Sequence, residues 1–335
     1  MLFIILLAGG WLYYFIAQHM DDPANLARSN QESVVWTIVK GSNLSHVNRQ
    51  LFSEGIIGNA RIMSAYATFL GQTEIQAGDY WITGDDTARS LLLKFNLGKV
   101  VRRSITFPEG WSFKQWLSHL SGVEQFENAV SDDYSQILLM AQVDVVNPEG
   151  WLFPDTYSYT STDSIVDILK QAHIKMQQTL ATEWQARQLD LPYKTPYEAL
   201  IMASIVEKET GLISERGQIA GVFVRRLKKG MRLQTDPTVI YGMGDLYRGN
   251  IRRRDLQEYT PYNTYRVDGL PPTPIAMPSA GAIRAALHPE EGSSLYFVAR
   301  GDGGHYFSDT LEEHNKAVRK YQIDHRKKEY QSSPQ

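Results

Sequence analysis

Two carboxylates in the middle of the chain have a setting suited to acid and base chemistry. Glu207 and Glu209 lie near the end of a segment, residues 195–211, whose pattern predicts a helix. At 3.6 residues per turn, Glu209 extends a stripe of apolar side chains at the last turn. Burial and the negative end of the helix dipole both disfavour a charged carboxylate, so we expect a raised pKa for Glu209. A Glu that is protonated at neutral pH is what a general acid requires.

The two carboxylates cannot act on one bond, because Glu207 lies about 200° around the helix from Glu209. The apolar stripe favours Glu209, whereas Glu207 follows Ala203 and Ser204 and fits a solvated face equally well. The alternative is an exposed helix end without chemistry.

Signals at both ends define this helix. Thr195 is a typical N-cap, Pro196 suits the first position, and Glu198 completes a capping box with Thr195. Gly211 is expected to stop the helix.

A cluster of polar side chains follows the helix, at residues 231–241, and a smaller one at residues 262–265. Such side chains can orient hydroxyl and amide groups of a ligand, and loops often carry functional residues. The alternative is a capped turn whose polar groups satisfy the backbone. The candidate substrate-binding residues are Gln234, Thr235, Asp236, Tyr241, Asn263 and Tyr265.

Composition excludes several function classes. The 335 residues carry a net charge of −3, so the chain lacks the basic excess that nucleic-acid binding needs. It has no cysteine, which rules out disulfides and thiolate sites. The 8 histidines include no HExxH pair, so no catalytic metal is expected, and no nucleophile-elbow pattern supports a serine hydrolase. Residues 301–305 lack the Lys of a phosphate loop and predict a hairpin turn.

The elements that must position these residues predict an α+β chain. Strand patterns at 34–39 and 80–83 enclose helical patterns at 44–51 and 62–70, which gives a small β-α-α-β unit followed by a helix at 88–97. The aromatic-rich residues 149–157 fit core packing or a ligand platform. The predicted boundaries are an anchor at 1–20, a linker at 21–33, a small domain at 34–100, a larger α+β domain at 101–325 and a polar tail at 326–335.

The first residues predict a transmembrane helix. Met1–Ala17 carries no charge and has about the length that spans a membrane. The alternative is a cleaved signal peptide, but Trp11, Tyr13 and Tyr14 replace the small residues of a cleavage site. No Lys or Arg precedes the segment, so charge does not orient it.

Residues 36–44 resemble the opening of a LysM glycan-binding module, in which an aromatic-rich strand turns through a glycine into a helix. That family usually has Asp and Thr where this chain has Ser42 and Asn43, and both of these residues can cap the helix. The alternative is a small spacer that binds nothing.

Residues 205–210 resemble the helix end of lysozyme-like lytic transglycosylases, in which the carboxylate just before a hydroxyl residue is catalytic. Here that carboxylate is Glu209, before Thr210. A longer resemblance to the endolytic murein transglycosylase family, also called YceG-like, runs through several segments in order. They are residues 203–210, 214–216, 232–242, 262–265, 269–272 and 288–289.

This resemblance implies cleavage of the β-1,4 bond between N-acetylmuramic acid and N-acetylglucosamine within glycan strands, without water, to give a 1,6-anhydromuramic end. Glu209 would act first as acid and then as base, without a cofactor. It further implies a single-pass protein of the inner membrane with its catalytic domain in the periplasm, trimming or terminating nascent strands beside the peptidoglycan synthases.

Two other functions stay open from the residues. A hydrolytic muramidase would pair Glu209 with Asp236 or Glu215 as a base that activates water. A non-catalytic scaffold would only bind peptidoglycan, through the LysM-like unit.

Overall fold

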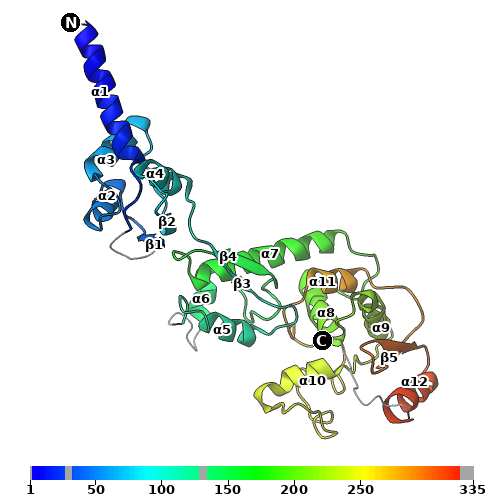
Figure 1. Ribbon diagram of the computed structural model, residues 1–335. Coiled ribbons are helices and arrows are strands. Elements are labelled where there is room, and N and C mark those ends of the chain that lie inside the picture. Colours follow the sequence, from blue (N-terminus) through cyan, green and yellow to red (C-terminus); the bar gives the residue numbers. More distant parts are fainter. Residues whose placement is uncertain (1, 27–31, 128–133, 325–335) are drawn as a thin grey trace. The chain divides into compact units, whose positions relative to one another are not determined.

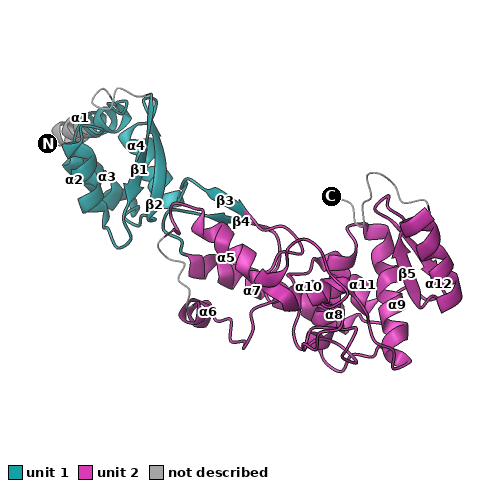
Figure 2. Ribbon diagram, turned by 90° about the horizontal axis from the view of Figure 1, so that it is seen from below, with its two compact units in different colours: residues 1–105, 158–164 teal, residues 106–157, 165–335 magenta. Residues whose placement is uncertain are grey.

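The computed structural model describes residues 2–26, 32–127 and 134–324 (Figure 1). It divides into two compact units, drawn in different colours in Figure 2: Met1–Ile105 with Ser158–Ser164, and Thr106–Tyr157 with Ile165–Gln335. We call them unit 1 and unit 2. Helices mix with short strands, which form three two-stranded sheets in the described part of the chain. The α+β class predicted from the sequence is confirmed.

Unit 1 has the predicted β-α-α-β order followed by a helix. Strands β1 and β2 pair antiparallel, from Ser33 opposite Thr83 to Ile38 opposite Gly78. Asn43 caps the first helix of this motif, because its side chain accepts a hydrogen bond from the amide of His46 (2.9 Å). The elements are α1 (Leu2–Asp21), β1 (Ser33–Ile38), α2 (Leu44–Ser53), α3 (Ala60–Leu70), β2 (Gly78–Thr83) and α4 (Ala88–Leu97).

Helix α1 covers the predicted anchor except for Met1, which lies outside the described residues. Within the described chain, no helix combines the length and the apolar character that a membrane crossing needs. The carboxyl end of α1 packs into unit 1, where Met20 is fully buried and Asp21 pairs with Arg89 (2.6 Å). The anchor stays a prediction.

Part of the predicted linker belongs to the core of unit 1. Ala24 and Leu26 are buried, and the amide of Ala24 donates to the carbonyl of Asp86 (2.6 Å). Residues 27–31 of the linker and the predicted polar tail at 326–335 lie outside the described residues.

The remaining elements hold the sites discussed below. They are β3 (Arg103–Thr106), α5 (Phe113–Ser121), α6 (Ser135–Met140), β4 (Thr156–Tyr159), α7 (Ile165–Gln185), α8 (Pro196–Glu209), η1 (Ile213–Glu215), α9 (Arg216–Lys228), α10 (Asp236–Met243), η2 (Gly244–Leu246), α11 (Ala280–Leu287), β5 (Tyr296–Ala299), β6 (His305–Ser308), α12 (Leu311–Val318) and η3 (Arg319–Asp324).

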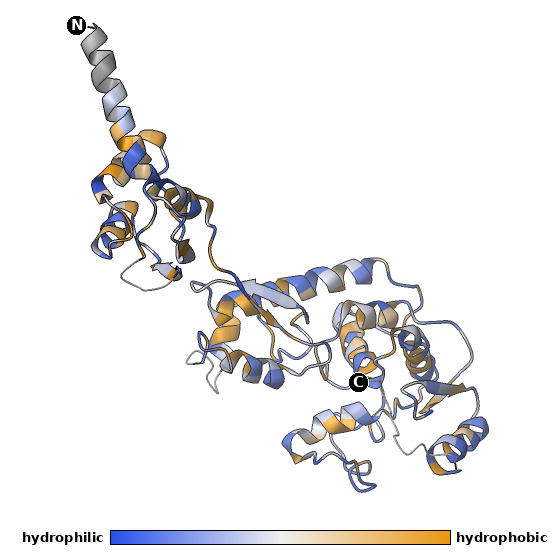
Figure 3. Ribbon diagram, viewed as in Figure 1, coloured by the Kyte–Doolittle hydropathy of each residue, from blue (hydrophilic) through white to orange (hydrophobic). Residues whose placement is uncertain are grey.

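Helix α8 is the central helix of unit 2. The sequence predicts an apolar stripe on one face, but every residue from Ala199 to Val206 is buried, because α7, α9, α10 and α11 all contact it. Hydrophobic residues, coloured orange in Figure 3, make up much of α8 and α11. Glu209 therefore ends a helix that the surrounding core holds in place.

The ends of α8 match the predicted signals with one exception. Thr195 caps the helix by accepting from the amide of Glu198 (3.2 Å), and the helix ends at Glu209, two residues before Gly211. The predicted capping box is wrong, because the Glu198 carboxylate accepts from the amide of Lys194 and not from that of Thr195.

Two smaller predictions in unit 2 are also decided. Strands β5 and β6 form an antiparallel hairpin around the glycines of residues 301–304, as expected. In the aromatic segment at 149–157, Leu152 and Tyr157 are buried and Trp151 stacks on Tyr197 (5.6 Å between ring centres), so this segment serves core packing.

Candidate active site

A cleft of about 1020 Å³ in unit 2 opens at the carboxyl end of α8. One group of its lining residues is polar and comes from the end of α8 and the segments after it: Glu209, Gln234, Thr235, Asp236 and Tyr265. A second group comes from the β5–β6 hairpin and α12 and includes Tyr296, His305 and His314. The structure thus brings four of the six candidate substrate-binding residues together around Glu209.

Glu209 has the raised pKa that a general acid needs. Its pKa is raised to about 7, chiefly by burial, and the negative charge of Asp236 contributes to the rise. The hydroxyl of Thr235, which donates to the Glu209 carboxylate, and the positive charge of Arg226 act in the opposite direction. The carboxyl therefore exchanges a proton near neutral pH, so it can both donate and accept one.

The turn before α10 holds Thr235 against Glu209. Gln234 adopts a left-handed backbone conformation with φ of 53°, which is unusual for a residue with a side chain. The turn is fixed by Thr264, whose carbonyl accepts from the amide of Gln234 and whose hydroxyl accepts from the amide of Thr235 (both 3.1 Å). The Thr235 hydroxyl thus reaches Glu209 from a rigid support.

Replacing Thr235 with Val is expected to shift the pH dependence of activity. Val keeps the shape but removes the donor that stabilises the charged carboxylate, so the pKa of Glu209 rises. The acid form then persists to higher pH, and the alkaline limb of the rate profile moves up by about one pH unit. Thr210→Val is the matched control, since the Thr210 hydroxyl accepts from the amide of Leu212 (3.0 Å). Equal profiles for the two variants would contradict the assignment of Thr235.

Asp236 and Tyr265 form a linked pair on the cleft wall. The Tyr265 hydroxyl donates to the Asp236 carboxylate (2.7 Å), and burial raises the pKa of Tyr265. Asp236 also opens α10, where its charge lies near the positive end of the helix dipole. Both side chains face the space beside Glu209.

Tyr241 and Asn263, the other two candidate substrate-binding residues, are not among the residues that line the cleft. The Tyr241 hydroxyl donates to Glu149 (3.2 Å). Asn263 is 1% exposed, donates to the carbonyl of Glu258 (2.6 Å) and accepts from the amide of Tyr265 (3.0 Å). Asn263 thus shapes the loop that carries Tyr265, whereas Tyr241 joins α10 to Glu149.

Glu207 has a structural role, because buried groups of the fold occupy its carboxylate. Its side chain is 5% exposed, so the solvated face that the sequence allowed is not observed. It pairs with the buried Arg216 (3.0 Å) and accepts from the amide and hydroxyl of Ser279 (2.9 and 2.5 Å). Both carboxylate oxygens are engaged, which leaves Glu209 as the carboxylate of this helix end that lines the cleft.

Sequence reasoning missed Arg226 and Glu149. Arg226 lines the cleft and donates to the carbonyls of Leu295 (2.6 Å) and Leu233 (2.9 Å), so it joins the residue before β5 to the turn before α10. Burial raises the pKa of Glu149 to about 7, but Glu149 lies outside the cleft lining. A buried Arg in an amphipathic helix has no sequence signature of its own, and Glu149 belongs to an aromatic segment that reads as core.

Histidines also line the cleft, although they form no metal-binding pattern in the sequence. In the described part of the chain, no group of three His, Asp or Glu side chains is placed to hold a metal ion. His305 is bonded to Glu215 (2.8 Å), and His314 stacks on Tyr296 (5.2 Å between ring centres).

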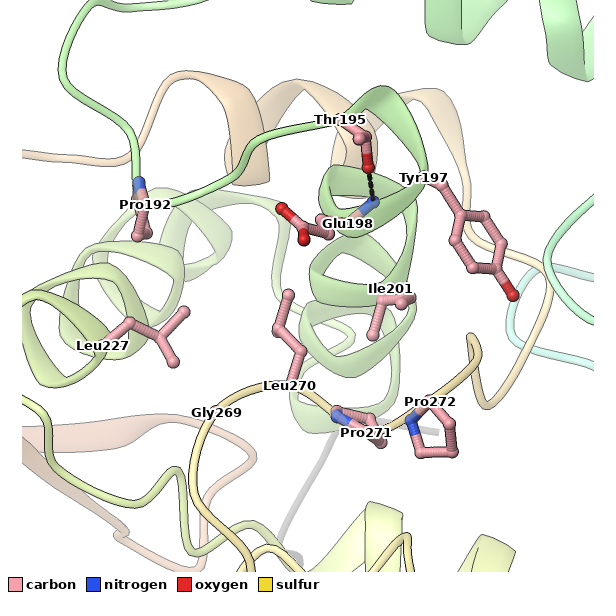
Figure 4. Close-up of a pocket in the computed structure, with 10 residues that line it drawn as sticks. All are labelled: Pro192, Thr195, Tyr197, Glu198, Ile201, Leu227, Gly269, Leu270, Pro271 and Pro272. Atoms are coloured by element: carbon pink, nitrogen blue, oxygen red, sulfur yellow. Dashed lines mark hydrogen bonds between the residues drawn. The ribbon is translucent and has the colours of Figure 1, made fainter.

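A second pocket, of about 510 Å³, lies at the opposite end of α8 (Figure 4). Leu270, Pro271 and Pro272 supply part of its apolar lining. Two polar side chains of this pocket, Thr195 and Glu198, accept hydrogen bonds from backbone amides at the start of α8. The carboxyl group suited to proton transfer is in the larger cleft.

Comparison with known proteins decides the family. A profile of the YceG-like family matches residues 36–320, which include Glu209 and all but two of the residues that line the cleft. The chain belongs to the YceG-like family. A YceG-like protein from Listeria monocytogenes has a similar crystal structure, with a TM-score of 0.55 and 31% identity, covering 85% of this chain and 99% of that one.

Two relatives of this YceG-like chain carry the name endolytic murein transglycosylase. The protein from Bacillus subtilis is 28% identical, and the match covers 95% of this chain and 91% of that protein. The protein from Streptococcus pneumoniae is also 28% identical, over 94% of this chain but only 62% of its own length.

Proposed function

We propose that this protein is an endolytic murein transglycosylase with Glu209 as its catalytic acid and base. The observation that carries the proposal is a carboxyl group with a pKa of about 7, fixed at the end of a buried helix and lining a cleft of about 1020 Å³. The names of the relatives from Bacillus subtilis and Streptococcus pneumoniae support the same function.

The reaction uses one carboxyl group twice. Protonated Glu209 gives its proton to the oxygen of the β-1,4 bond between N-acetylmuramic acid and N-acetylglucosamine, and the bond from the anomeric carbon to that oxygen breaks. The C6 hydroxyl of the muramic residue then attacks the anomeric carbon, and the Glu209 carboxylate accepts its proton. The product has a 1,6-anhydro end, Glu209 is protonated again, and neither water nor a cofactor is consumed.

The cleft residues near Glu209 are suited to holding the sugar. Gln234, Asp236 and Tyr265 offer amide, carboxylate and hydroxyl groups to sugar hydroxyls and N-acetyl groups. Thr235 holds the Glu209 carboxylate. Asn263 supports the loop that carries Tyr265, and Tyr241 supports α10 through its bond to Glu149.

We place the enzyme in the inner membrane through the helix at residues 1–20, with unit 2 in the periplasm. There it would trim or terminate nascent strands beside the peptidoglycan synthases. Glycan binding by the LysM-like residues 34–100 belongs to the same proposal, and the order of β1, α2, α3 and β2 supports it.

Hydrolysis is the second candidate, and one observation favours it. Asp236 lines the same cleft and lies close enough to Glu209 to raise its pKa, so a second carboxylate is present to activate water. One of its oxygens already accepts a hydrogen bond from the Tyr265 hydroxyl (2.7 Å).

Product chemistry tests the proposal. The full chain in detergent is incubated with purified peptidoglycan, and the soluble fragments are analysed by mass spectrometry. We expect fragments with anhydro ends, which are lighter by one water than reducing ends. Reducing ends would establish the muramidase, and the absence of any fragment would favour a binding scaffold.

A further inference from the structure

A carboxylate and a histidine from distant parts of the chain form a buried pair in the wall of the cleft. Glu215 ends η1, shortly after α8, and His305 begins β6. One oxygen of Glu215 accepts from the backbone amide of His305 (3.1 Å), and the other lies 2.8 Å from its Nδ1. The side chains are 14% and 4% exposed. This geometry fixes the orientation of the imidazole ring.

The contact also fixes which nitrogen carries the hydrogen. A carboxylate can only accept, so Nδ1 is the donor, and in the neutral ring Nε2 is left as an acceptor. Among the described residues no hydrogen bond to Nε2 is found. The ring lines the cleft and is braced by the edge-on contact of Phe297 (5.3 Å between ring centres).

We propose that His305 is a substrate-positioning residue, which accepts a hydrogen bond from a sugar hydroxyl at Nε2 while Glu215 holds its ring and tautomer. The inference rests on the proposed function, because it requires a glycan strand in the cleft. His305 adds a contact from the β5–β6 hairpin, whereas Gln234, Asp236 and Tyr265 belong to the other group of lining residues.

A purely structural role for the pair makes a different prediction. If Glu215 served only to attach β6 to η1, any side chain that donates to it from the position of Nδ1 would be sufficient. The position of Nε2 matters only if a ligand uses it. Two amide variants separate these roles.

His305→Asn places an amide NH near the position of Nδ1 and can keep the bond to Glu215, but it has no atom at Nε2. His305→Gln is one carbon longer, so its amide oxygen can reach the position of Nε2. We expect His305→Asn to lose about tenfold in kcat/KM on peptidoglycan, mainly through KM, with an unchanged melting temperature. His305→Gln should recover part of this loss.

A spectroscopic measurement reports on the contact directly. In the Glu209→Gln protein labelled with ¹⁵N-histidine, addition of an uncleaved muramic acid–N-acetylglucosamine tetrasaccharide should shift the Nε2 signal of His305. The Nδ1 signal should stay that of a protonated nitrogen. The signal of the half-buried His19 on α1 provides an internal reference that the sugar should not move.

The two proposals fail in different ways. Parental kcat/KM for His305→Asn, or an Nε2 signal that stays constant while other cleft signals move, would overturn the role of His305 alone. Absence of anhydro products from the parent protein would overturn the proposed function.

Discussion

The Glu209→Gln variant is expected to lose about 100- to 10,000-fold of the rate of strand cleavage, the contribution that a positioned acid and base makes. Gln keeps the size of the side chain and can still accept from the Thr235 hydroxyl, so the cleft should stay intact. The Gln side chain has no acidic proton to give to the leaving oxygen. The measurement is the initial rate of release of soluble fragments from peptidoglycan.

The pH dependence follows from the raised pKa of Glu209. Since the reaction begins with the protonated acid, the rate of the parent protein should fall as the pH rises above about 7. Because the folded protein binds this proton more tightly than the unfolded chain, the carboxyl costs stability as the pH rises from about 4.5 through about 7. Glu209→Gln should therefore be more stable than the parent at pH 8, by on the order of 1–3 kcal/mol.

Glu198→Gln provides the matched control. It makes the same change at the other end of α8, in the second pocket, and should leave the cleavage rate unchanged. A Glu209→Gln protein that keeps more than about a tenth of the parental rate would assign the proton transfer to another group.

Glu207→Ala is expected to lower the free energy of unfolding by about 3–5 kcal/mol, the usual cost of removing one partner of a buried ion pair. The substitution leaves the 7% exposed Arg216 without its buried carboxylate and removes an acceptor of Ser279, the N-cap of α11. Helices α8, α9 and α11 lose a common connection. Chemical denaturation followed by circular dichroism measures the effect.

A surface pair is the control for this substitution. Glu312 pairs with Lys316 on α12, with both side chains more than 70% exposed, and Glu312→Ala should change the stability by less than about 0.5 kcal/mol. If the two Ala variants were equally stable, Glu207 would contribute nothing through its ion pair. The two neighbouring carboxylates thus have opposite effects on stability at pH 8, since Glu207 stabilises the fold through its ion pair whereas the charged Glu209 costs stability, and only Glu209 is expected to affect turnover directly.

Local signals in the sequence were sufficient to predict α8 and the place of Glu209 in its last turn. Thr195 caps this helix and Pro196 begins it, as each residue's own chemistry dictates. The partner of Glu198 was wrong because the amides of Lys194 and Thr195 lie next to each other, and only the path of the chain before the helix decides between them. Burial on all sides of α8 was missed for a similar reason, since Glu207 and Ser204 look solvent-facing until their partners are known.

The second wall of the cleft was beyond sequence reasoning. Arg226 meets the carbonyl of Leu295 across 69 residues, and Glu215 meets His305 across 90. No local pattern records such pairings, because neither member changes the periodicity of its own segment. The glycines before His305 correctly predicted a turn, but they could not predict that this hairpin would line the cleft of Glu209.

The cleft is lined by two groups of residues that are distant in the sequence, and this limits how far the chain can be shortened. A protein ending before Leu295 would keep Glu209, Thr235 and the whole of α8, yet the guanidinium of Arg226 would lose its bond to the Leu295 carbonyl and its contact with the Tyr296 ring (4.9 Å). A minimal version for engineering or crystallisation therefore has to retain the hairpin of β5 and β6, and fusion partners are better attached beyond Asp324.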